Sequence, residues 1–155
     1  MSIDLGETKY MAKHINNLNE LQKALNPVLT DLTNQLADQF YKTLNHFLYD
    51  YYHGWTPESY RRTEAFLRSA VKVDAKPFRN GVKASVYVDR DSMDSYVNAT
   101  GFQVATWANS GLHGGLKVNH TPHVWDDTLN ETINNGSLLQ SAIHYLKDHG
   151  FDVRQ

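Results

Sequence analysis

The chain has 155 residues, a net charge of −2 and no cysteine. A domain of this length buries about 68–70% of the surface of its unfolded chain, which is enough for one core without disulfides or metals. The absence of cysteine excludes thiolate metal sites and thiol nucleophiles, and no apolar run approaches the roughly 18 residues of a membrane-spanning helix. We therefore expect one soluble domain over residues 1–155, with no membrane partner.

Positive charge is concentrated in the middle of the chain. Residues 61–90 contain only three acids, Glu64, Asp74 and Asp89, against eight bases: Arg61, Arg62, Arg68, Lys72, Lys76, Arg79, Lys83 and Arg90. Such a basic band attracts polyanions or acidic protein surfaces. It is equally typical of a solvated face of a hairpin, so both interpretations stay open.

The first half of the chain predicts helices. Residues 2–5 can form a short edge strand, and Asn17 with Glu20 predicts the start of a short helix to about Leu25. Asn26 and Pro27 then predict a second helix start. From there to about Tyr52, apolar residues recur every three or four positions, which predicts a spine helix about 39 Å long. The stripe consists of Leu29, Leu32, Leu36, Phe40, Leu44, Phe47 and Tyr51.

A joint is expected directly after this helix. Gly54 is a suitable C-cap, Thr56 can cap a new helix, and Pro57 suits its first position. Trp55 and Tyr60 stand at the two positions of a hydrophobic staple, which fixes the angle between consecutive helices. These residues predict a structural joint between the spine helix and the next segment of the chain.

That next segment changes to a period of two. Val71, Val73 and Ala75 alternate with polar residues, and a second alternating run extends from Val82 to Val88. Asn80-Gly81 supplies the positive dihedral angles that a tight turn needs. We expect a β-hairpin over about residues 69–88.

The C-terminal part has weaker patterns. Residues 95–109 can be helical, although 102–107 can equally form a strand, and a long loop is expected at about 109–126. Thr128 is a possible cap of a short helix, and Ser137 of a final one with an apolar face. The fold class is therefore α+β, with a long spine helix and shorter helices packed on a small antiparallel sheet that contains the hairpin.

Three histidines offer a first alternative function. His113, His120 and His123, with Asp126 or Asp127 nearby, are ligand types that zinc and iron use, which would suit a metal-dependent hydrolase. The spacings between them, seven residues and then three, match no metal-binding or catalytic motif. The second alternative is a nucleic-acid-binding domain that uses the band 61–90, although a pI of about 6.4 is low for such domains.

Two short motifs carry a family resemblance. Pro57, Tyr60, Arg62 and Thr63 form a Pro-x-x-Tyr-x-Arg-Thr element that leads into the hairpin, and Gly111, His113 and Gly114 form a later Gly-x-His-Gly segment. With the order of helices and strands around them, these motifs resemble the neck proteins of long-tailed bacteriophages, the tail-completion or head-to-tail joining proteins. The commoner form of that family carries small residues where this chain has Tyr60, Arg61 and Arg62.

The resemblance implies a non-enzymatic virion protein without a cofactor. It implies a ring of copies, hexameric or dodecameric, between phage connector and tail-terminator proteins around the DNA channel, assembled in the bacterial host cytoplasm. Within such a ring we expect the loop residues Gly111, His113 and Gly114 to make contacts. The side chains expected to face a partner, or DNA in the lumen, are Arg61, Arg62, Arg68, Lys72, Lys76 and Arg79.

Overall fold

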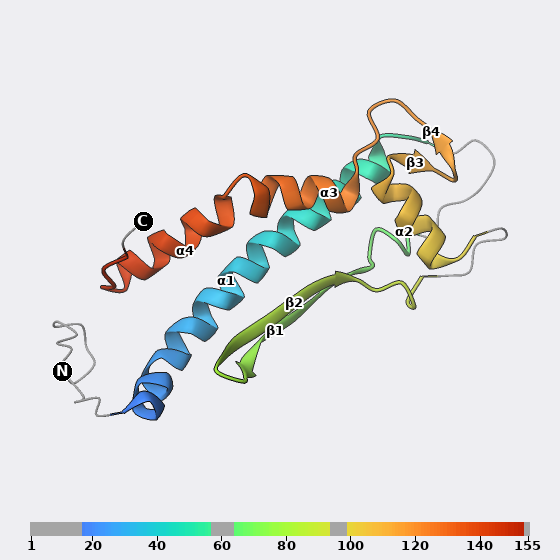
Figure 1. The fold of residues 1–155 in the computed structure, drawn as a ribbon. Helices are drawn as coiled ribbons and strands as arrows, with labels where there is room; N and C mark the ends of the chain where they lie inside the picture. The colour runs from blue at the N-terminus through green and yellow to red at the C-terminus, as the bar shows by residue number, and fades with distance from the viewer. Residues whose placement is uncertain (1–16, 57–63, 94–98, 154–155) are drawn as a thin grey trace.

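The computed structural model describes residues 17–56, 64–93 and 99–153. Helix α1 (Leu18–His53) runs through the middle of the molecule, with a hairpin of β1 (Ala70–Phe78) and β2 (Gly81–Val88) on one side (Figure 1). On the other side lie α3 (Val124–Leu129), the π-helical turn η1 (Asn130–Asn134) and α4 (Ser137–Asp148). Helix α2 (Gly101–Asn109) and the short strands β3 (Leu112–His113) and β4 (Leu116–Lys117) gather near the C-terminal end of α1. The predicted α+β class is confirmed.

Helix α1 is longer than the sequence patterns predict. Its start is as expected, since Asn17 Oδ1 accepts a hydrogen bond from the Glu20 N–H at 3.0 Å. The predicted break at Asn26-Pro27 is wrong, because the helix continues through Pro27 to His53. Pro27 removes only one backbone donor, and the leucines before and after it share one helical phase, so a single helix keeps the whole stripe on one side. Among the described helices, none is long and apolar enough to cross a membrane.

The hairpin packs one face against α1. Ala70 pairs with Val88 and Lys72 with Val86, and the ladder is interrupted by a bulge between Val73 and Lys76. The backbone N–H of Ala75, inside the bulge, donates to Asn34 Oδ1 on α1 at 2.7 Å. The helix therefore provides the acceptor for a donor that the bulge takes out of the strand ladder.

The hairpin turn differs in detail from the prediction. The strands are joined through Arg79 and Asn80, since Phe78 and Gly81 are the last paired residues. Arg79 adopts the positive φ, 52°, whereas Asn80 and Gly81 do not. The predicted hairpin is confirmed, and the assignment of the left-handed conformation to Asn80-Gly81 is wrong.

The core lies at the C-terminal half of α1. Leu44 and Leu48 have no exposed surface, and the buried cluster around them extends to the turn before β1, to the residues after β2, and to α2 and α3. Its other members are Tyr51, Tyr52, Phe66, Ala70, Met93, Ala108 and Val124. At the opposite end of α1, Leu18 is 82% exposed. The spine helix is thus fully packed only along part of its length.

The region between the hairpin and the C-terminus is more ordered than predicted. Helix α2 resolves the choice between helix and strand in favour of a helix, and Thr100 with Gln103 forms a capping box at its start. The expected loop at about 109–126 contains the β3–β4 pair, and α3 begins within it at Val124. Thr128 does not cap a helix; it is buried inside α3 and donates to the Val124 carbonyl at 2.6 Å.

The final helix begins at the predicted position, but without the predicted cap. Gly136 occupies the N-cap position of α4 with φ 79°, while Ser137 Oγ donates back to the carbonyls of Glu131 and Thr132. The predicted edge strand at residues 2–5 and the helix start at Pro57 lie outside the described residues.

Candidate interaction surfaces

The predicted basic residues fall into three environments. Arg61 and Arg62 lie outside the described residues. Arg68 is exposed and pairs with Glu64 one turn earlier, with 3.6 Å between Nη1 and Oε2. Its side chain is 70% exposed, and exposed pairs of this kind contribute little to stability.

Lys72 points toward α1 rather than toward solvent. Its Nζ lies 2.5 Å from Asp38 Oδ1 on α1 and 3.1 Å from Asp74 Oδ1, and its side chain is only 23% exposed. The hydrogen bond to Asp38, and then that to Asp74, raises the pKa of Lys72 above its ordinary value. The structure therefore gives this predicted contact residue a role inside the chain, where it ties the hairpin to the spine helix.

The remaining cations surround an aromatic ring at the end of the hairpin. Lys76 and Lys83 are direct cross-strand partners, and the Phe78 ring has Lys83 Nζ and Arg79 Cζ each 5.2 Å from its centre. Phe78 is 49% exposed. We call these four residues the hairpin tip. Within the described residues none of its three cations has an ion pair, and like charges directly opposite each other are unfavourable.

The face of the hairpin turned away from α1 continues this exposed surface. Val71 pairs with Tyr87 and Val73 with Ser85, and Val73 and Tyr87 remain substantially exposed. In the described part of the chain, β1 and β2 form a sheet of two strands. Each strand therefore also has an edge without a strand partner there, a feature that favours association with another chain.

Two of the predicted joint and loop residues meet in the interior. His113 is 6% exposed and its ring stacks on Tyr51, with 4.0 Å between ring centres. The Trp55 ring lies 5.0 Å away, and the Tyr51 hydroxyl donates to the Leu112 carbonyl at 2.9 Å. Trp55 thus belongs to a contact between the end of α1 and β3 that the staple prediction did not include.

The other predicted joint and loop residues differ in their exposure. Thr56 is exposed at the edge of the described segment, whereas Pro57 and Tyr60 lie outside it. Gly111 is buried with φ 69°, and a side chain there would meet the His123 ring at 3.0 Å. Gly114 is exposed with φ 55°, so of the predicted loop contacts it is the one that solvent and partners can reach.

The histidines of the metal alternative do not form a cluster. His113 is engaged in the stack, His123 Nδ1 lies 3.0 Å from the Asn109 carbonyl oxygen, and His120 is exposed with φ 62°. Among the described residues, no group of three or more His, Asp or Glu side chains is placed to hold a metal ion. The geometry gives the hydrolase alternative no support.

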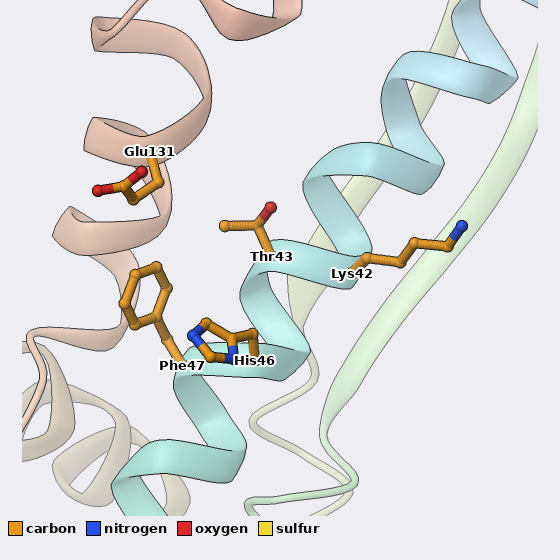
Figure 2. A pocket seen from close by; sticks show the side chains of 5 residues that line it. All are labelled: Lys42, Thr43, His46, Phe47 and Glu131. Carbon is orange, nitrogen blue, oxygen red and sulfur yellow. The ribbon is translucent and has the colours of Figure 1, made fainter.

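An open pocket lies between α1 and η1, on the side of α1 away from the hairpin. Its volume is about 520 Å³, and it is lined by Lys42, Thr43, His46, Phe47 and Glu131. We call it the α1–η1 pocket. Figure 2 shows Glu131 on η1 across from the α1 residues, with its carboxylate turned away from Thr43, while the Lys42 ammonium is directed away from Glu131. The Glu131 carboxylate has no ion pair within the described segments.

The sequence patterns did not indicate this pocket. Glu131 comes to the pocket from the π-helical turn η1. Two buried hydroxyls on α3 and η1 donate to carbonyls one turn earlier, Thr128 to Val124 and Thr132 to Thr128, the second at 2.5 Å. π turns are rare and frequently accompany functional sites.

Comparison with known proteins gives a family for the chain. A family model described as YomN matches residues 17–148. No curated protein and no solved structure gave a match. The family is of Bacillus phage origin, which agrees with a phage protein. Since the matched residues make up most of the 155-residue chain, the protein belongs to the YomN family.

Proposed function

We propose that the protein is a structural component of the phage neck, a ring subunit that joins the head connector to the tail around the DNA channel. The observation that carries this proposal is the arrangement of two exposed and chemically different surfaces on opposite sides of one spine helix. The hairpin tip is aromatic and basic, and the α1–η1 pocket contains an acid. A subunit with such surfaces can contact neighbours on both sides.

Further support comes from the family and from the shape of the fold. The family of phage origin fits a virion or assembly role. Large apolar side chains remain exposed on several elements, including Phe102 on α2, Leu116 on β4, Ile133 on η1 and Leu139 on α4. In this proposal, neighbouring subunits cover these side chains. The partners in this proposal are further copies, the connector and the tail terminator, with non-specific DNA contact in the lumen.

Disruption of the gene in the phage tests this function. We expect heads filled with DNA and separate tails by electron microscopy, a loss of infectious titre, and recovery when the wild-type protein is supplied in trans. Labelled protein should be found in purified particles at the head–tail junction. Normal titre and normally joined particles without the protein would contradict the proposal.

A charge-reversal variant refines the experiment. Arg61→Glu together with Arg62→Glu should fail to restore joining, because the reversed charges repel acidic partners or DNA. Lys117→Glu, on the exposed strand β4, is the matched control and should restore joining. If the double variant restores joining as well as the control does, Arg61 and Arg62 have no part in it.

A further inference from the structure

We infer that the hairpin tip of one copy docks into the α1–η1 pocket of a second copy, so that successive copies associate head to tail. This rests on the ring-subunit function proposed above, and it identifies the two surfaces that form the contact. It assigns the tip residues Phe78 and Lys83 and the pocket residues Phe47 and Glu131 as the centre of the interface.

The exposure and charge of the hairpin tip suit it to insert into the pocket of another copy. Phe78 lies at the end of the hairpin, half exposed, with the cationic groups of Arg79 and Lys83 over its ring. Lys76 and Lys83 face each other across the strands without an acid between them in the described structure. A carboxylate brought to this end of the hairpin would therefore relieve repulsion as well as form new ion pairs.

The pocket offers the complementary chemistry. Phe47 provides an apolar wall, to which an aromatic ring can pack edge-on or offset. Glu131 provides a carboxylate on the opposite side of the opening (Figure 2). Lys42, the cation among the lining residues, points away from Glu131. The volume of about 520 Å³ leaves room for one aromatic side chain and the end of a neighbouring cation.

The two surfaces of one chain cannot meet each other. The hairpin packs on one side of α1 and η1 on the other (Figure 1). The Gln22 side chain contacts the Arg79 carbonyl at the tip, whereas the pocket begins 20 residues later on α1, at Lys42, which is about 30 Å along a helix. A contact between two different surfaces of identical chains is heterologous, and it forms a ring when its rotation closes.

The charges on the two surfaces favour a second copy of the chain over nucleic acid as the partner of the tip. Phosphate would satisfy the cations, but it would leave Glu131 and the pocket unfilled. Along the C-terminal side of the molecule, residues 124–152 contain five acids, Asp126, Asp127, Glu131, Asp148 and Asp152, and one lysine, Lys147. The basic hairpin and this acidic side complement each other across two copies of the chain.

The experiment uses the full-length chain and two single variants, Lys83→Glu and Glu131→Lys. The wild type should show a concentration-dependent mass by analytical ultracentrifugation. Each variant alone should associate at least about tenfold more weakly, because like charges then meet at the contact. An equal mixture of the two variants should recover association, since every contact between unlike copies again pairs a lysine with a glutamate. The double variant in one chain should recover it as well.

A control variant tests whether the effect is specific to the contact. Lys117→Glu changes the same charge at another exposed strand and should associate like the wild type, and circular dichroism checks that all variants are folded. A wild type that remains monomeric at the highest concentration, or a mixture that associates no better than its components, would overturn the inference. Loss of self-association together with salt-sensitive DNA binding that Lys83→Glu abolishes would assign the tip to nucleic acid instead.

Disulfide trapping gives an independent readout. The chain has no cysteine, so Lys83→Cys and Glu131→Cys introduce the sole thiols. Under mild oxidation, an equal mixture of the two variants should give a larger share of mixed dimer than random pairing produces, while an equal mixture of Lys117→Cys and Glu131→Cys should not. A random distribution of dimers would refute the contact. The neck function would be unaffected by that result, since it is tested by particle assembly and not by this interface.

Discussion

The Lys72 ammonium lies between two carboxylates, Asp38 on α1 and Asp74 on its own strand, and it forms the charged contact between the hairpin and the spine helix. An isolated two-stranded hairpin is marginally stable in water. Its position therefore depends on what it packs against, here Ala70 and Val86 against the core and Lys72 against Asp38. The same hairpin carries the exposed tip, so this ion pair holds the tip in place.

The first prediction concerns the pH dependence of this contact. The hydrogen bonds that the Lys72 ammonium makes to Asp38, and then to Asp74, raise the pKa of Lys72 above 10.5. The stability that this ion pair adds to the fold is therefore fully present below that pH and is lost as the pH rises through the raised pKa. Lys72→Met should lower the urea midpoint at pH 7, and the gap from the wild type should close at higher pH. Lys117→Met, at an exposed position on β4, is the control and should show no such gap. A gap that stays constant above about pH 11 would contradict this assignment.

The hairpin illustrates what sequence periodicity can and cannot predict. Alternation over about 69–88 correctly predicted two strands and their turn. It did not predict that Lys72 faces the helix while Val73 and Tyr87 stay exposed, because the side of a two-stranded sheet that is covered depends on the partner element. The bulge at Val73–Lys76 also shifts the alternation, and no local residue type signals it.

In helix α1, a local sequence signal was misleading because packing along the whole helix overrides it. Local signals at Asn26 and Pro27 are those of a helix start, and they predicted a break that does not exist. The leucines on both sides lie in one helical phase, and tertiary packing along that stripe outweighs a single lost hydrogen bond. The α1–η1 pocket was beyond prediction for a related reason, since it requires knowing that η1 lies beside α1.

The second prediction tests the continuity of α1. Pro27 is exposed inside the helix, so Pro27→Ala should raise the free energy of unfolding by about 1–3 kcal/mol, because it restores a backbone donor and removes a steric clash. Ala24→Gly, at an exposed position one turn before, should lower it by about 1 kcal/mol. Urea denaturation measures both. If Pro27→Ala destabilises the protein, residue 27 begins a separate helix instead.

The third prediction separates a packing role from a metal role for His113. His113→Ala should lower the free energy of unfolding by about 2–3 kcal/mol, because the buried ring packs against Tyr51 and Trp55 and its loss leaves a cavity. His113→Phe should recover part of this loss, since it keeps an aromatic ring there. Zinc should leave the melting temperature of the wild type unchanged. A zinc-dependent increase that disappears in both His113→Ala and His120→Ala would instead support a metal site.

The last prediction separates the backbone of the hairpin turn from its charge. Arg79 holds a positive φ of 52°, a conformation that costs a residue with a Cβ about 1 kcal/mol and costs glycine almost nothing. Arg79→Gly should therefore be more stable than Arg79→Ala by about 1 kcal/mol in urea denaturation. Both variants lack the guanidinium beside Phe78, so both should weaken self-association to the same degree in ultracentrifugation. If association instead tracks stability, so that the glycine variant associates better than the alanine variant, the turn conformation rather than the charge determines docking.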